Sequence, residues 1–357
     1  MIMKSIKNKL RIASLSLVIM LLGSSTVLAT EYTKTSSKSF DVKSGALLDL
    51  NTEFGDIKAY NWDKQKISIE ATITVSASSQ SKADERFRRI QLEINGDKNI
   101  VSVLSKIESG FFNKNGNNIS IDFIIYYPSD IRLKMNLDFG SAFFEDLKGA
   151  TDIEVSYGSF NANNLSSVNN EIQISFGKLQ VATVEAGNIE IEYGGCEIEE
   201  SKTLDLRTSF SGNVNIEKVG KLLLKSAYDK VSIGEANEIS GSVEFTSFTL
   251  QRINTSLDMK AAYGGFKVYS INPNFKLIDL RSEFCGLKLY VDANSNFTFY
   301  ADVELGSFDY PKEKVTITNF QKDVTELMME GYFGTKEKAK GNMRLSVEHA
   351  SATINLK

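Results

Sequence analysis

Proline, cysteine, histidine and tryptophan are all scarce in this chain. Its 357 residues include three prolines, two cysteines, one histidine and one tryptophan. Few prolines permit long β ladders, because proline cannot donate a ladder hydrogen bond. A Ser-His-Asp arrangement has one candidate histidine, and two cysteines with one histidine cannot build a Cys/His zinc cluster. We therefore expect no catalytic residues, no metal site and no cofactor.

The chain also has no apolar run of the roughly 20 residues that a membrane-spanning helix needs. Its apolar stretch at residues 12–22 follows four basic residues and precedes Val27-Leu28-Ala29. This order is typical of a secretory signal peptide, here residues 1–29, and an N-terminal membrane anchor is the alternative. We expect an exported protein of the periplasm, the outer membrane or the cell surface.

Negative charge prevails in the predicted mature protein. Removing residues 1–29 removes four positive charges and no negative ones, which changes the net charge from −4 to −8. A chain of this charge is a poor partner for nucleic acid and for anionic membrane surfaces. We expect it to bind an envelope macromolecule, either a polysaccharide or a protein, with no transmembrane segment after signal removal.

Aromatic residues recur along the chain at a nearly fixed interval. Between Phe139 and Phe284 the successive steps are 17 to 21 residues, which indicates a stacked repeat. Glycine directly follows eight of the recurring residues. At four others the surrounding pattern is the same, but another residue stands in place of the glycine. The eight are Phe54, Phe139, Tyr157, Phe176, Tyr193, Tyr263, Leu305 and Phe333, and the four are Phe210, Tyr228, Phe245 and Phe284.

The residues around each of these ring positions alternate as in a β-strand. With the ring residue as position zero, apolar or small residues recur at −6, −4, −2, +3, +5 and +8. This period of two predicts strands on both sides, and the shift from even to odd offsets predicts a turn where glycine supplies a positive φ. For Tyr228 the residues are Leu222, Leu224, Ser226, Val231, Ile233 and Ala236.

Stacking such units predicts an all-β fold, a parallel β-helix or solenoid with coils of about 18 residues. Phe and Tyr alternate strictly from Phe139 to Phe284, so a coil of 36 residues is the alternative. We expect the rings to stack inside the solenoid. Cys196 and Cys285 fall five repeats apart, beyond disulfide reach, and should be unpaired and packed as small apolar residues.

The regular repeat is interrupted near both ends. We divide the chain into a signal peptide at 1–29, a first coil at 30–62, a cap insertion at 63–133, a regular solenoid at 134–310, and an irregular excursion with a closing coil at 311–357. In the insertion, residues 81–95 read as a helix that begins at a Ser81/Asp84 capping pair, among several strands. The last repeat places His349 in the ring position.

Outward-facing positions supply the candidates for ligand contact. Acidic residues in adjacent coils would lie within about 5 Å of one another, and three tyrosines, Tyr60, Tyr269 and Tyr290, share position +6. The ordinary interpretation is a solvated sheet face with strand tyrosines, and the functional one is a face that binds sugar or calcium. The candidate residues are Asp152, Glu154, Glu171, Glu190, Glu192, Tyr269 and Tyr290.

The order of segments resembles a known family. Residues 48–61 contain the turn Phe54-Gly55-Asp56, Tyr60-Asn61-Trp62-Asp63 precedes a strand, and a helix and a strand ending Ile125-Tyr126-Tyr127-Pro128 lead into the serial coils. Across nearly the whole mature chain this resembles the bacterial putative-adhesin family of unknown function, related to head-GIN adhesin-like proteins. The resemblance implies a parallel β-helix in a bacterial envelope and no catalytic residues.

Two functions follow from these patterns. The first is a non-catalytic secreted or cell-envelope solenoid, an adhesin-like binding or structural module, because stacked repeats present long faces to extended ligands. The alternative is a carbohydrate-active β-helix enzyme of the polysaccharide lyase or hydrolase type, which is an analogy of fold. Such an enzyme would need paired carboxylates, for which Glu190 and Glu192 are the nearest candidates.

Overall fold

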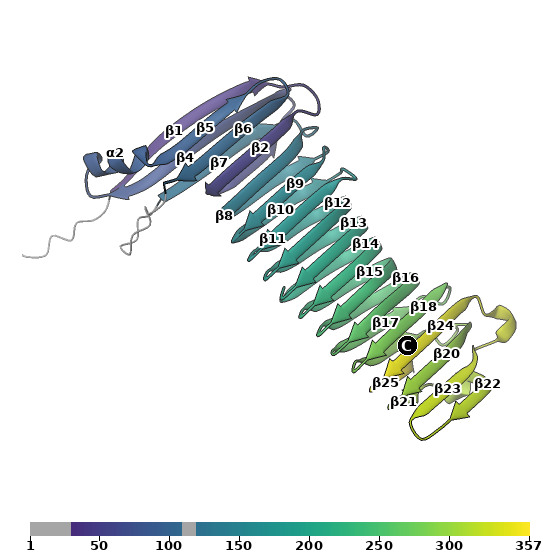
Figure 1. Cartoon of the computed structure of the whole chain (residues 1–357). Coiled ribbons are helices and arrows are strands. Elements are labelled where there is room, and N and C mark those ends of the chain that lie inside the picture. The colour runs from purple at the N-terminus through teal and green to yellow at the C-terminus, as the bar shows by residue number, and fades with distance from the viewer. Residues whose placement is uncertain (1–29, 109–118) are drawn as a thin grey trace, which may run out of the picture.

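The computed structural model describes residues 30–108 and 119–357, which form an elongated β-solenoid with one α-helix (Figure 1). The predicted signal peptide and the segment 109–118 lie outside the described residues. Each coil contributes to two walls: the first wall is built from the strands before each ring position, and the second wall from the strands after it. The fold is therefore the expected parallel β-helix.

Parallel pairing between equivalent strands fixes the coil at about 18 residues. Ile189 pairs with Ile172 in the preceding coil and with Leu206 in the following one, so the 36-residue coil is wrong. Long strands such as β12 continue from the second wall of one coil into the first wall of the next. The strands of the regular region are β8 (Arg132–Leu147), β9 (Thr151–Ser156), β10 (Gly158–Leu165), β11 (Asn170–Ser175), β12 (Lys178–Glu192), β13 (Gly195–Ser209), β14 (Asn213–Ala227), β15 (Lys230–Glu244), β16 (Ser247–Ala262), β17 (Gly265–Ile271), β18 (Leu277–Glu283) and β19 (Gly286–Val291).

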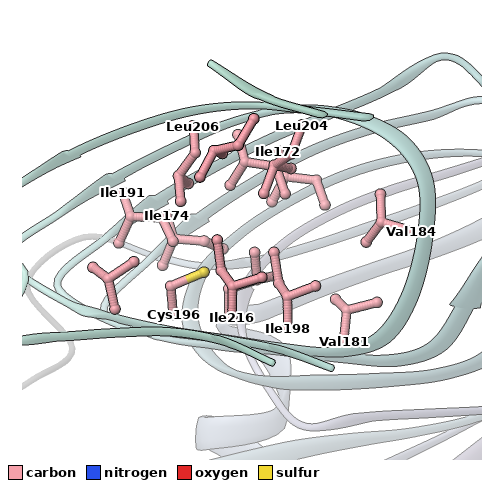
Figure 2. Close-up of a cluster of buried hydrophobic side chains, with 14 of the residues drawn as sticks. Ile172, Ile174, Val181, Val184, Ile191, Cys196, Ile198, Leu204, Leu206 and Ile216 are labelled. Atoms are coloured by element: carbon pink, nitrogen blue, oxygen red, sulfur yellow. The ribbon is translucent and has the colours of Figure 1, made fainter. Parts of the chain in front are cut away.

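The core is a continuous column of aliphatic side chains between the two walls. Ile172 and Ile174 of the first wall face Cys196 and Ile198 of the second, and all four are buried (Figure 2). Cys196 and Cys285 are both unpaired and buried, as expected. Burial raises the pKa of the Cys196 thiol to about 12, so at neutral pH it packs as a protonated, small apolar group.

The ring column lies outside the core, which corrects the expectation of an internal stack. The rings from Phe139 to Phe284 expose 43–54% of their residue surface. The predicted turn, in which glycine has the positive φ, occurs at Gly55 with 142° and at Gly140 with 136°. From Tyr157 onward the ring residue itself has the positive φ, for example 52° at Tyr157 and 61° at Tyr228. At Tyr157 and in the later coils, glycine after the ring is needed for close approach between coils and not for its φ.

Successive rings form one stack along the solenoid. From Phe54 to His349 the ring centroids are 4.5–5.2 Å apart and the planes are within 16° of parallel. His349 stacks on Phe284, which confirms its predicted place in the ring position. We call this column the ring ladder; its members are Phe54, Phe139, Tyr157, Phe176, Tyr193, Phe210, Tyr228, Phe245, Tyr263, Phe284 and His349.

At the N-terminal end, the coil that is first in space comes second in the chain. β6 and β7 pair in parallel with the strands of the earlier coil, β2 and β3, on the side away from β8. Antiparallel strands then cover this end, β5 on β6, and β4 followed by β1 on β7. The strands are β1 (Thr30–Asp41), β2 (Leu47–Phe54), β3 (Ile57–Asn61), β4 (Lys66–Ala77), β5 (Ile90–Gly96), β6 (Ile100–Ile107) and β7 (Ile119–Tyr127).

The helix of this cap is shorter than the sequence predicted. Helix α2 spans Gln80–Arg88, and its N-cap is Ser79, whose hydroxyl accepts a hydrogen bond from the Lys82 amide. The predicted capping pair and the helical extension to residue 95 are wrong, because Ile90 begins strand β5. The apolar residues after position 89 also fit a period of two, and the edge of β6 supplies the ladder partner that decides between helix and strand.

The C-terminal end repeats this exchange of order. β24 lies between β18 and β20, and β25 lies between β19 and β21, so the last coil in the chain is inserted one place before the end of the solenoid (Figure 1). The antiparallel strands β23 and β22 cover β20. The elements are β20 (Phe297–Glu304), β21 (Ser307–Asp309), η1 (Lys312–Lys314), β22 (Val315–Lys322), β23 (Glu326–Phe333), η2 (Lys336–Lys338), β24 (Gly341–Glu348) and β25 (Ser351–Leu356).

Candidate functional site

The outer face of the second wall carries a groove that runs along the solenoid. Positions +4 and +6 point outward on either side of the inward +5 residue, so each coil adds one residue to each margin. In the coil of Phe210 the pattern is shifted by one, and Asn215 and Glu217 point outward on either side of Ile216. The central part has a volume of about 580 Å³, over a floor that includes Ala162, Val181 and Ile198. Its margins are lined by Phe143, Asn161, Asn163, Gln180, Ala182, Glu197, Glu199, Asn215 and Glu217.

Amides and carboxylates dominate these margins, and several are free to bind a ligand. No hydrogen bond within the described ranges engages the side chains of Asn163, Asn215 or Glu217. A carboxamide can donate and accept at once, which suits a ligand rich in hydroxyl groups. Gln180 donates to Glu197 at 2.6 Å, and Lys178 pairs with the same carboxylate at 2.9 Å. The hydrogen bonds from Lys178 and Gln180 lower the pKa of Glu197, which keeps it ionised.

An aromatic cluster adjoins the groove at its N-terminal end. The Phe143 ring lies 6.1 Å from Tyr60, and Tyr60 lies 5.9 Å from Tyr126, which stacks on Trp62 at 5.5 Å. Strand pairing brings these residues together, because Tyr60 and Tyr126 are register partners in β3 and β7. The Trp62 indole N–H donates to the Lys66 carbonyl at 2.7 Å, which fixes the ring. Tyr126 is 42% exposed.

A second hollow of about 660 Å³ continues the groove toward the C-terminal end and shares Glu217 with the first. It forms where Gly234 leaves a gap in the +6 column; a β-carbon there would lie 2.4 Å from the Glu217 carbonyl oxygen. Tyr269 and Tyr290 line its far side with their rings 5.9 Å apart and 17° from parallel. The Lys267 ammonium lies 4.1 Å from the Tyr269 ring centre.

The two groups of candidate residues from the sequence lie on opposite walls. Tyr269 and Tyr290 belong to the groove on the second wall. The acidic residues lie on the outer face of the first wall: Asp152 and Glu154 in β9, Glu171 in β11, and Glu190 and Glu192 in β12. Asp152 and Glu171 are register partners, while Gln173 separates Glu154 from Glu190.

Most of the groove residues were not predicted from the sequence. Trp62, Tyr126, Phe143 and the amides at +4 and +6 were not among the candidates. The outward residues after each ring recur with the same period as those before it, and this period was the available signal. The contact between Tyr60 and Tyr126 was not predictable from the sequence, because it depends on the exchanged order of the N-terminal coils.

Neither a metal centre nor a membrane span emerges from the described residues. They hold no group of three or more His, Cys, Asp or Glu side chains that could bind a metal ion. None of the helices within residues 30–108 and 119–357 has the length and apolarity to cross a bilayer.

The chain is similar in structure to several solved bacterial proteins. One is a putative cell adhesion protein from Clostridium sporogenes, with a TM-score of 0.21 and 10% identity over 92% of this chain and 100% of that one. Another is a putative adhesin from Parabacteroides merdae, with a TM-score of 0.32 and 12% identity over 71% and 94%. A third is a putative lipid binding protein from Parabacteroides distasonis, with a TM-score of 0.27 and 11% identity over 70% and 94%.

The first two of these neighbours are a putative cell adhesion protein and a putative adhesin, in agreement with the putative-adhesin family that the sequence resembles. The sequence matches no protein-family model and no curated protein. At such low TM-scores the likeness supports no functional conclusion.

Proposed function

We propose that this protein is a non-catalytic, adhesin-like binding module of the bacterial envelope that holds an uncharged polysaccharide chain lengthwise in the second-wall groove. The observation that carries the proposal is the groove itself: two joined hollows, with exposed aromatic rings at both ends and unpaired amides between them. Aromatic side chains contribute large apolar contact with a polar end, and a few placed polar groups then fix orientation.

Charge in the first hollow favours an uncharged or amino-bearing polysaccharide over an acidic one, while Arg252 and Lys357 balance Glu217 and Glu235 in the second hollow. Glu199 and Glu217 line the groove without an ion-pair partner in the described ranges, and Glu197 stays ionised beside Lys178. An acidic polymer laid along these carboxylates would be repelled. Export by the predicted signal peptide would bring the groove to such polymers in the envelope.

Binding of soluble polysaccharides to the mature chain tests this proposal. Calorimetry with neutral β-glucan, xylan and mannan, and with alginate as the acidic counterpart, should show binding to at least one neutral polymer and none to alginate. Replacing both tyrosines, Tyr269→Ala with Tyr290→Ala, should weaken that binding about tenfold, as expected from the loss of two aromatic contacts.

Tyr332→Ala is the matched control, because Tyr332 lies on the C-terminal hairpin, away from the groove. An affinity that the double replacement leaves unchanged, or binding of alginate alone, would contradict the assignment of this groove. The same samples are assayed for new reducing ends and unsaturated products. Turnover that disappears in Glu190→Gln or Glu192→Gln would favour the polysaccharide lyase or hydrolase alternative.

A further inference from the structure

The ring ladder leaves a long apolar strip exposed at one corner of the solenoid. Nine of its rings, from Phe139 to Phe284, are 43–54% exposed. If a buried aromatic side chain removes 150–250 Å² from water, these nine expose on the order of 800 Å² together. That is larger than the apolar patches usual on a monomer, and about what one partner contributes to a standard protein interface.

The flanks of the strip leave the rings uncovered. Position −1, on the first wall, is small at several rings, for example Ser209, Ala227 and Ala262. Position +2, on the second wall, is likewise often small, as at Ser247 and Gly265. None of the described lysine or arginine side chains lies over a ladder ring; the cation–π contacts are at other aromatic residues.

Charged residues on the two flanks have opposite sign. Position −1 includes Glu192 and Glu244, and position +2 includes Lys178 and Lys230. Lys178 pairs with Glu197, whereas Lys230 and Glu244 are exposed and have no ion-pair partner within the described ranges. They lie one coil apart, since Tyr228 and Phe245 stack at 4.8 Å.

We propose that the ring ladder is the interface of a homodimer in which two copies lie side by side and parallel, related by a two-fold axis along the solenoid. Rotation by 180° about that axis exchanges the flanks, so Glu244 of each copy faces Lys230 of the other. An antiparallel pair would instead place like flanks together, glutamate against glutamate. An interface of this kind is self-complementary.

The spacing of the ladder points to a second copy as the partner. Its rings repeat every 4.5–5.2 Å over ten successive steps. A partner whose spacing differs slightly loses register after a few steps, whereas another copy has the same spacing throughout. In the parallel pair the two second-wall grooves run in the same direction on opposite faces of the dimer, so neither groove is covered by the interface.

Charge reversal on the flanks tests the dimer without disturbing the stacked rings. Sedimentation equilibrium of the mature chain should show a reversible dimer. The single variants Glu244→Lys and Lys230→Glu should each lower the association constant about tenfold, since each puts like charges together at both contacts. An equimolar mixture of the two variants should dimerise again, because the introduced lysine of one then faces the introduced glutamate of the other's flank.

Both replaced side chains are exposed, so circular dichroism and thermal unfolding of each variant should match the original chain. Glu171→Lys, on the first wall away from the ladder, serves as the control and should leave dimerisation unchanged. A chain that remains monomeric at all concentrations would overturn the proposal. So would a dimer that both reversals leave intact, or a mixture that does not associate better than its components.

Discussion

At the scale of single residues, the ring positions combine a strained backbone with a favourable stack. Ten non-glycine residues in the described ranges have φ between 49° and 61°, a conformation that costs an L-residue roughly 1–2 kcal/mol. Ring stacking returns roughly 0.5–1.5 kcal/mol per pair. The backbone adds further support, because the amide of each ring residue donates to the next coil, as Tyr193 does to the Ser209 carbonyl at 3.0 Å. The strain is therefore offset by contacts that exist only in the assembled stack.

The glycine after each ring allows close approach between coils, and substitutions at Gly194 and Gly195 can test this role. A β-carbon on Gly194 would lie 2.1 Å from the Gly177 carbonyl oxygen, whereas on Gly195 the nearest atom would be 3.6 Å away. We expect Gly194→Ala to lower the free energy of unfolding by roughly 1–3 kcal/mol through overpacking. Gly195→Ala should change it by about 0.5 kcal/mol or less. Urea denaturation of the two variants compares them, and equal stabilities would contradict the close-approach explanation.

At the scale of the structural element, polar residues replace the glycine column in three consecutive coils. Ser211, Asp229 and Thr246 follow Phe210, Tyr228 and Phe245, and all three are buried. The Asp229 carboxylate accepts hydrogen bonds from the Thr208 hydroxyl, the Ser226 hydroxyl and the Ser211 amide, each at 2.6 Å. A buried carboxylate with three donors is satisfied, so these coils are held by a polar cluster where their neighbours use close backbone packing.

Removing the acceptor from this cluster should be costly. Asp229→Leu leaves two hydroxyls and one amide unpaired inside the fold, and we expect a loss of at least about 2 kcal/mol in the free energy of unfolding. Adding Thr208→Val and Ser226→Ala to the same variant should recover part of that loss, because two of the orphaned donors disappear. Urea unfolding of the three-fold variant against Asp229→Leu decides the matter. If the added replacements lower stability further, the hydrogen bonds are not the cause.

At the scale of the whole molecule, both ends are closed by a coil that is out of chain order and by antiparallel strands beyond it. The inserted coil is paired on both sides, as β24 is with β18 and β20. The open edge of the solenoid, which would otherwise pair with other chains, is thereby covered. Because a coil contacts only its neighbours, damage at one end should stay local.

Deleting residues 341–357 tests this closure. The deletion removes β24 and β25, so β18 and β20 lose the partner they share. Hydrogen exchange should show lost protection in residues 297–333, while residues 151–262 of the same molecule keep theirs and serve as an internal control. Unchanged protection in β20 and β23 would mean that the C-terminal hairpin remains folded without the inserted coil.

The repeat, the strand period, the approximate coil length, the unpaired cysteines and the place of His349 were all predictable from the sequence. These are properties of local alternation and of a fixed step, and both are visible in a single chain. The outward position of the ring ladder, the strand after position 89 and the exchanged order of the coils at both ends depend on contacts that form only in the folded molecule. An alternating pattern indicates which side chains share a face. Whether a side chain at a corner points into the core or to solvent depends on the path of the turn, which packing against neighbouring coils selects.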